Sequence, residues 1–209
     1  MLGNSTVNGV GTFGTDFIRG LAMNGTTNLF IGGNFHTVGN ESLSANGVVS
    51  WDGSNWNILG TNSTNNGITG GNGMGINALA MNGSHTLFVG GSFTLVGGSV
   101  SVNNIASWDG SNWNFLGTNS TENGVLGGEV FVLAMNGTSN LFVGGMFRTV
   151  GGNSITANNI ASWDGSNWNI LGTNSTNNGV SGLSSAVTAL AMNGTDPPTK
   201  VKLPPTNKV

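Results

Sequence analysis

The chain has 209 residues, of which 37 are Gly and 33 are Asn, whereas charged residues make up only 6%. This composition is rich in turn formers and poor in helix formers, which excludes a helical bundle. A formal net charge of −3 with five Lys and Arg residues excludes the basic surface of a nucleic-acid-binding protein. No apolar run approaches the roughly 18 to 20 residues that span a bilayer, so no transmembrane segment is predicted.

The absence of Cys excludes disulfides, thiolate catalysis and Cys-ligated zinc. The first 17 residues lack the basic and apolar pattern of a signal peptide, so none is expected in the sequence as written.

Three sequence blocks recur in a fixed order, so the chain is built from one repeat of about 55 residues. The block Leu-Ala-Met-Asn-Gly begins at Leu21, Leu79, Leu133 and Leu190. Gly-Gly-x-Phe begins at Gly32, Gly90 and Gly144, and Ser-Trp-Asp-Gly-Ser-Asn-Trp-Asn begins at Ser50, Ser107 and Ser162. These blocks define the period of the fold.

Each repeat contains four apolar runs of strand length and none of helix length. In the second repeat they are residues 76–81, 86–93, 104–108 and 113–116. Asn82-Gly83 and Asp109-Gly110 are typical of tight hairpins, which in an antiparallel meander lie at one end of the sheet. The other two links, residues 94–103 and 117–129, are long and rich in Asn, Thr and Gly. They are expected at the opposite end, as a face of long loops.

A four-stranded unit of this size cannot bury both of its faces alone, so neighbouring units must stack on it. We therefore predict an all-β protein, a β-propeller of four-stranded antiparallel blades, with a β-solenoid as the main alternative. The repeats occupy residues 1–195. Full blades are expected at about 11–60, 68–117 and 125–172, with a partial blade at 180–195 whose inner strand is 186–192.

The ends of the chain differ from the repeats. Residues 2–10 match residues 59–67, so the chain opens as an earlier blade would be ending, and it is interpreted as a fragment of a longer array. Residues 196–209 hold all four Pro and are interpreted as a disordered or non-native tail. Three blades and a fraction are expected to leave either an open arc or a ring closed by the N-terminal and C-terminal segments as a partial fourth blade. An open arc would expose apolar edges, so self-association through these edges is expected.

The strand end Val89-Gly90-Gly91, the pair Trp108-Asp109 and Trp113 after a tight turn together resemble the kelch repeat. The similarity is to the kelch-like blades of galactose-oxidase-type central domains and of fungal cortical cell-polarity markers, over about residues 17–194. It implies a propeller with a recognition role at a cell surface. The repeat departs from the kelch pattern by placing Trp where those blades usually have Tyr, and the link to the second Trp is shorter.

The block around Asp109 also resembles, one residue short, the Asp-box turn of sialidase-type propellers. The chemistry of both families is excluded here. The chain has no Tyr and no Cys for copper-radical chemistry, no Tyr nucleophile, and only Arg19 and Arg148 where sialidases need three Arg. We predict no enzymatic activity and no cofactor. A glycan-processing enzyme fragment is the alternative.

The repeated side chains favour structural roles. Asp52, Asp109 and Asp164 are expected to fix Asx-type turns rather than bind metal, because each repeat offers a single carboxylate and Ca²⁺ needs roughly six to eight oxygens. The six Trp are predicted to fill the space between blades, with exposed sugar-stacking surfaces as the alternative. Met23, Met81, Met135 and Met192 are predicted to be core. The Gly pairs are expected to mark close backbone approach or a bulge rather than a phosphate site.

A binding site is predicted on the long-loop face, because loops on a rigid scaffold usually carry function. The candidate residues are His36, Thr94 and Arg148, which follow the Gly-Gly-x-Phe strand in the three repeats, with Asn40, Glu41, Glu122 and Glu129. The predicted function is a binding or scaffold module for a protein or glycan ligand. Nine Asn-x-Ser/Thr sequons favour a glycosylated protein in an extracellular or cell-surface location.

Overall fold

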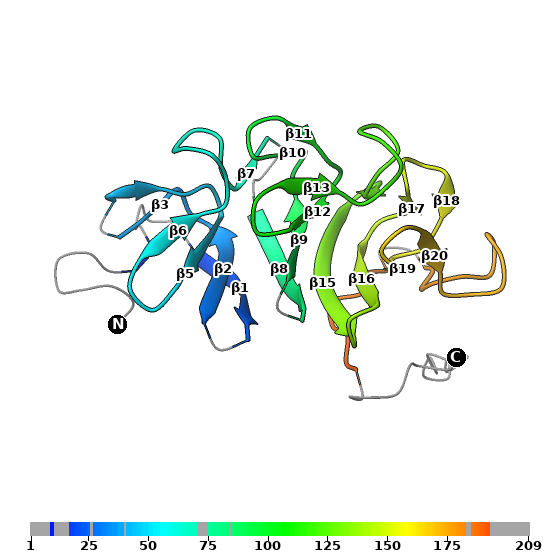
Figure 1. The fold of residues 1–209 in the computed structure, drawn as a ribbon. Helices are drawn as coiled ribbons and strands as arrows, with labels where there is room; N and C mark the ends of the chain where they lie inside the picture. The colour runs from blue at the N-terminus through cyan, green and yellow to red at the C-terminus, as the bar shows by residue number, and fades with distance from the viewer. Residues whose placement is uncertain are drawn as a thin grey trace.

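The computed structural model describes residues 9–10, 17–25, 27–39, 41–70, 75–83, 85–182 and 185–192. These residues form an all-β structure in which every strand pair is antiparallel, and none of them lies in a helix (Figure 1). The prediction of an all-β fold built from antiparallel units is therefore confirmed.

Three four-stranded sheets repeat the same meander, with each strand paired to the next one of its sheet. Sheet 1 consists of β1 (Phe17–Asn24), β2 (Asn28–Asn34), β5 (Val48–Trp51) and β6 (Trp56–Ile58). Sheet 2 consists of β8 (Gly75–Asn82), β9 (Thr86–Ser92), β12 (Ile105–Trp108) and β13 (Trp113–Phe115). Sheet 3 consists of β15 (Glu129–Asn136), β16 (Asn140–Met146), β19 (Ile160–Trp163) and β20 (Trp168–Ile170). The four runs predicted in the second repeat match the strands of sheet 2.

The long links also contain strands, which the sequence did not indicate. Two three-stranded sheets form where a short hairpin pairs with a strand from the link that precedes its repeat. They are β7 (Ile68–Thr69) with β10 (Leu95–Val96) and β11 (Val100–Ser101), and β14 (Val125–Leu126) with β17 (Thr149–Val150) and β18 (Ile155–Thr156). The first repeat has β3 (Thr37–Val38) paired with β4 (Leu43–Ser44), and Val10 forms a bridge with Val38. The long-loop face is therefore a set of small sheets at one end of the large ones (Figure 1).

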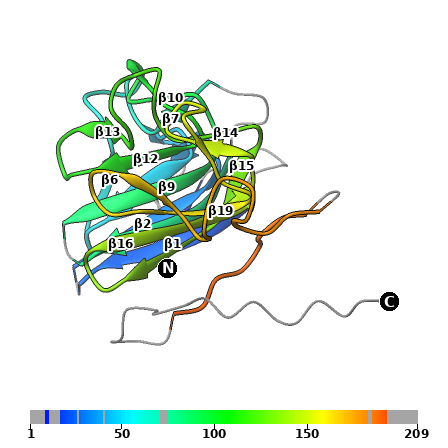
Figure 2. The ribbon, with the colours of Figure 1, turned by 90° about the vertical axis from the view of Figure 1, so that its right-hand side faces the viewer.

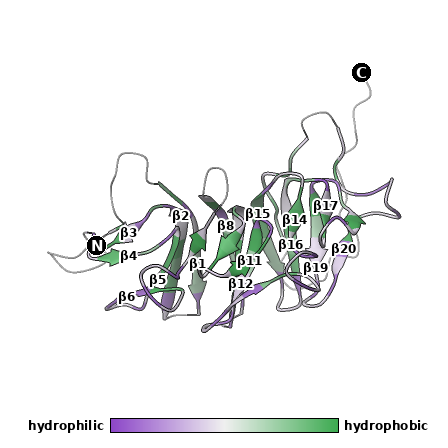
Figure 3. Ribbon diagram, turned by 90° about the horizontal axis from the view of Figure 1, so that it is seen from above, coloured by the Kyte–Doolittle hydropathy of each residue, from purple (hydrophilic) through white to green (hydrophobic). Residues whose placement is uncertain are grey.

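The three sheets follow one another as a fan. The inner strands β1, β8 and β15 pack side by side, while the outer strands β6, β13 and β20 are spread farther apart (Figures 1 and 3). Buried apolar side chains from neighbouring sheets form shared clusters, such as Phe30 and Val48 of sheet 1 with Ile76 of sheet 2. The core therefore lies between sheets rather than within one.

The Gly pairs make this stacking possible. A Cβ built on Gly32 would lie 2.7 Å from Ile76 Cγ2, and one on Gly90 would lie 2.5 Å from Val130 Cγ1. The second Gly of each pair lies beside a β-bulge of the inner strand, as Gly91 does against the Gly75 carbonyl. The predicted close approach and bulge are both present.

Two expectations are wrong. Residues 185–192 run beside sheet 3 but form no strand (Figure 2), although the Val187 N–H donates a hydrogen bond of 2.9 Å to the Gly145 carbonyl. Met23 is 48% exposed rather than core, because among the described residues no sheet packs on its face of β1. The tail at 196–209 lies outside the described residues, as do residues 1–8 and 11–16.

Candidate functional site

The Asp of each short turn acts as the predicted turn residue. Asp109 Oδ1 accepts the N–H groups of Ser111 and Asn112 at 2.9 and 2.7 Å. Asp52 accepts the same pair of bonds in its own turn, and these bonds with one from the Asn57 amide lower its pKa to about 2. The described residues contain no cluster of three or more His, Cys, Asp or Glu that could hold a metal ion.

Each Asp turn joins two Trp residues that face each other across paired strands. The ring centroids of Trp108 and Trp113 are 5.4 Å apart with the rings tilted by 54°. The second Trp of a pair also reaches the preceding repeat, since Trp113 Nε1 donates a 2.8 Å hydrogen bond to the Leu59 carbonyl. Three of the six Trp are buried and the other three are half-buried, which fits the predicted packing role better than a sugar-stacking surface.

A buried Asn organises each long loop, and the sequence analysis missed it. Asn123 is completely buried, its Oδ1 accepts the Asn103 N–H at 3.0 Å, and its carbonyl accepts from the Asn103 amide at 3.0 Å. The same pairing joins Asn66 to Asn46 and Asn178 to Asn158. The recurrence of Asn-Gly at 66–67, 123–124 and 178–179 is the signal that could have revealed it.

The predicted position after each Gly-Gly-x-Phe strand is exposed on the long-loop face. His36, Thr94 and Arg148 are all exposed, and each follows a fully buried Phe. The buried Phe anchors the backbone, so three different side chains are presented from the same place in three repeats. The structure therefore places these residues as expected, but in separate repeats.

Two of these positions line hollows. A hollow of about 230 Å³ is lined by Arg148, Met146, Asn158, Asn159, Ser181 and Ser185 with neighbouring backbone, and it lies between the end of β16 and the residues that follow sheet 3. A smaller one of about 110 Å³ is lined by His36 at the equivalent place in the first repeat. In the second repeat the amide of Asn104, the equivalent of Asn159, donates to the carbonyls of Val125 and Gly128.

The polar groups around the Arg148 hollow are mostly occupied. The Asn159 amide donates to the Val180 carbonyl at 2.6 Å and to Ser185 Oγ at 2.8 Å, while its oxygen accepts the Phe147 N–H. No hydrogen bond joins the Arg148 guanidinium to another described residue, whereas its backbone N–H donates to the Leu126 carbonyl and its carbonyl accepts the Ala157 N–H. The guanidinium is thus a charged group in this hollow that is available to a ligand.

The remaining predicted residues do not converge on the hollows. Glu122 accepts hydrogen bonds of 2.9 Å from Thr118 Oγ1 and the Asn119 amide, so it closes its own loop. Glu129 accepts from the Asn77 amide at 3.2 Å on the inner strands. Glu41 is exposed at the tip of the β3–β4 hairpin, and Asn40 lies outside the described residues.

Comparison of the chain with protein-family models, with curated proteins and with solved structures gave no match. The described part of the chain contains no helix that is long and apolar enough to cross a bilayer.

Proposed function

We propose that this chain is a non-enzymatic binding module whose kelch-like repeats form propeller-type blades and whose long-loop face holds a protein or glycan ligand. The observation that carries the proposal is the hollow of about 230 Å³ at Arg148, where an exposed guanidinium without a hydrogen-bond partner among the described residues lies beside the hydrogen-bonded side chains of Asn159 and Ser185.

The frame supports binding because it is rigid. The buried Asn pairs hold the loops, and the small sheets pair each loop with the next repeat. A rigid scaffold with variable exposed side chains is the usual arrangement of a recognition surface, because little conformational entropy is lost when a ligand binds. The variation between His36, Thr94 and Arg148 on one frame fits this role.

The chemistry of the hollow favours an acidic ligand. A guanidinium presents several N–H donors in a planar fork that matches a carboxylate. A volume of about 230 Å³ is below the roughly 300–1,000 Å³ of sites for drug-sized molecules. The hollow suits one acidic sugar unit or one carboxylate side chain, with further contacts along the loops.

A propeller-type arrangement and an extracellular location are parts of the same proposal. The four-stranded meanders, their fan and the contact of successive inner strands support blades that radiate from one side. Three sequon residues, Asn62, Asn119 and Asn174, are exposed at the same place in consecutive loops and could carry glycans.

The proposal is tested by measuring binding of the chain to immobilised acidic oligosaccharides and acidic peptides. We expect Arg148→Ala to weaken binding about tenfold or more, since it removes a charge-assisted bond. His36→Ala and Glu122→Ala are expected to have smaller effects. Ser166→Ala, on a short turn, is the matched control and should leave binding unchanged. Binding lost with Ser166→Ala but kept with Arg148→Ala would place the site on the other face, and turnover of an oligosaccharide would identify an enzyme.

A further inference from the structure

Both boundaries between sheets use the same contact. The inner strand of the following sheet inserts a branched side chain over the first Gly of the preceding sheet's pair, with Ile76 over Gly32 and Val130 over Gly90. The boundary is closed by a hydrogen bond from the second Trp of the following repeat to a Leu carbonyl of the preceding one. A sheet therefore has an inserting face and a receiving face.

The inserting face of sheet 1 carries the equivalent residues, but no other described sheet packs on it. Ile18, Leu21 and Met23 are 45%, 60% and 48% exposed. Their equivalents are buried or half-buried, with Ile76 at 0% and Leu133 at 8%. These three side chains form an apolar patch, here called the β1 face, and monomeric proteins seldom leave such a face open.

A buried donor beside this face also lacks its acceptor. Trp56 is the equivalent of Trp113 and Trp168, yet its Nε1 is buried and has no hydrogen-bond partner among the described residues. Leaving a buried N–H unpaired costs about 1–3 kcal/mol. Among the described residues, sheet 1 thus has neither a receiving face packed against it nor a carbonyl paired with this Trp.

The other end of the fan offers the matching groups. The Leu59 carbonyl accepts from both the Gly67 N–H and Trp113 Nε1, whereas the equivalent Leu171 carbonyl accepts only from the Gly179 N–H among the described residues. A carbonyl oxygen has two lone pairs, so among the described residues the Leu171 carbonyl has one acceptor position without a donor.

The receiving Gly of sheet 3 is covered by a segment without strand structure. Val187 lies over Gly144, with its Cγ1 2.6 Å from a Cβ built there, and its N–H makes one bond to the Gly145 carbonyl. By sequence position Val187 is the equivalent of Val130, but no strands accompany it. A single coil thus occupies the place that a whole sheet takes at the other boundaries.

We propose that the β1 face binds a second copy of this chain head to tail, with sheet 1 of one copy packed on sheet 3 of another in place of residues 185–192. Ile18 then covers the partner copy's Gly144, and Trp56 Nε1 donates to its Leu171 carbonyl. A face-to-face pair of β1 faces would leave this donor and this acceptor unpaired, so the head-to-tail arrangement satisfies more groups.

The exchange gives up the bonds of residues 185–192, which include the Val187 N–H to the Gly145 carbonyl and the Asn159 amide to Ser185 Oγ, but it replaces the bond of Gly9. Gly9 accepts the Gly39 N–H at 2.9 Å, as Gly67 accepts the Gly97 N–H, and Gly179 stands at the equivalent place at the end of the third repeat. When the third repeat's loop of one copy docks on sheet 1 of the other, the Gly179 carbonyl can accept the Gly39 N–H in place of the Gly9 carbonyl. The gain is burial of the β1 face and pairing of Trp56 Nε1, as in a domain swap.

The test is sedimentation velocity of the full chain over roughly three decades of concentration, since association follows mass action. We expect concentration-dependent oligomers. Leu21→Asp should weaken association at least tenfold without unfolding the chain, because this side chain is exposed. Val187→Asp should strengthen it, because it loosens the segment over Gly144. Ser120→Glu, which adds one charge on an exposed loop of the second repeat, is the matched control and should behave as wild type.

A mixing experiment distinguishes the head-to-tail arrangement from a symmetric one. Gly144→Ala should block the receiving face and Leu21→Asp the inserting face, so each variant alone is monomeric, whereas their mixture forms a one-to-one dimer. Circular dichroism tests whether both variants are folded. If Gly144→Ala is unfolded, the head-to-tail arrangement is tested instead by the opposite effects of Leu21→Asp and Val187→Asp on association. A wild-type chain that is monomeric throughout the range, or association unchanged by Leu21→Asp, would overturn the proposal.

Discussion

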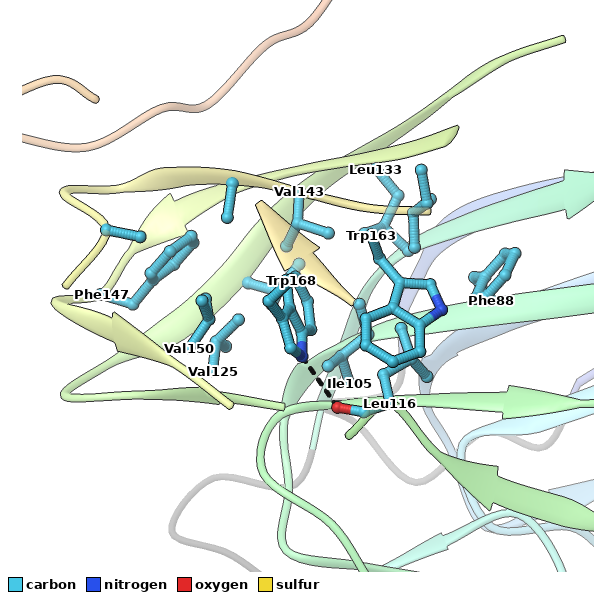
Figure 4. Packing of buried hydrophobic residues seen from close by; sticks show 14 of the residues in the cluster. Phe88, Ile105, Leu116, Val125, Leu133, Val143, Phe147, Val150, Trp163 and Trp168 are labelled. Carbon is cyan, nitrogen blue, oxygen red and sulfur yellow. Dashed lines mark hydrogen bonds between the residues drawn. The ribbon is translucent and has the colours of Figure 1, made fainter. Parts of the chain in front are cut away.

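The indole N–H of Trp168 donates a 2.8 Å hydrogen bond to the Leu116 carbonyl, which belongs to the preceding repeat (Figure 4). Trp168 is only 6% exposed and lies against Trp163, with ring centroids 5.4 Å apart. One side chain thus contributes apolar area within its own repeat and a polar tie to the neighbouring one. Trp168 therefore links its own repeat to the preceding one.

The first prediction concerns the replacement of Trp168. Trp168→Phe should destabilise the chain more than Trp56→Phe by about 1–2 kcal/mol, because only Trp168 loses a formed hydrogen bond. Trp56→Phe removes a buried N–H that has no partner among the described residues, and it is the matched control. Urea unfolding, followed at a concentration at which the chain is monomeric, measures the difference. Equal losses in the two variants would show that the bond contributes nothing.

The second prediction concerns the fit between Gly90 and Val130. Gly90→Ala should destabilise the chain by about 1–3 kcal/mol, because the new Cβ would lie 2.5 Å from Val130 Cγ1 and sheets 2 and 3 would have to separate. Adding Val130→Ala removes the closest of these contacts. The double variant should therefore lose about 1 kcal/mol less free energy of unfolding than the sum of the losses in the two single variants. Additive losses in the thermodynamic cycle would contradict direct contact.

The third prediction is a dependence of stability on pH from the turn carboxylates. Hydrogen bonds from backbone N–H groups lower the pKa of Asp52 to about 2 and also lower the pKa values of Asp109 and Asp164. A lowered pKa in the folded state gives stability that is present above the unfolded pKa near 3.8 and is lost as pH falls through the folded pKa. The melting temperature should therefore fall between about pH 4 and pH 2.

The triple variant Asp52→Asn, Asp109→Asn and Asp164→Asn should show a smaller fall over this range. The Asn oxygen still accepts the backbone N–H groups, so the turns persist while their titration is removed. Glu41→Gln, at an exposed hairpin tip, is the control and should retain the wild-type slope. Parallel curves for wild type and the triple variant would show that these carboxylates do not govern acid stability.

The features that depend on local sequence could be predicted. The strands of sheet 2 and the Asx turn at Asp109 follow from alternating apolar runs and from Asp-Gly chemistry, which act over a few residues. Because the same sequence blocks recur in each repeat, the strands of the other two large sheets could be predicted in the same way. The exposed position of Arg148 was predictable for the same reason, because it follows a strand that ends in a buried Phe.

The features that depend on neighbours could not be predicted. Met23 and Met81 stand in identical Leu-Ala-Met-Asn-Gly blocks, but Met23 is 48% exposed and Met81 half-buried, since among the described sheets one packs on Met81 and none on Met23. The pairing of Leu95 with Thr69 joins residues of two links, and two-residue strands have no periodic pattern to detect. The hollow at Arg148 likewise arises where several separate segments meet.

The fourth prediction concerns the buried Asn of the long loops. Asn123→Ala should destabilise the chain by about 1–3 kcal/mol, because it leaves the Asn103 N–H without its acceptor in a site closed to water. The loss should also loosen β14, whose first residue, Val125, donates its N–H to the Asn103 carbonyl. Urea unfolding and amide hydrogen exchange at Val125 measure the two effects. Ser120→Ala, exposed in the same loop, should change neither, and an unaltered exchange rate in Asn123→Ala would show that the loop is held by other contacts.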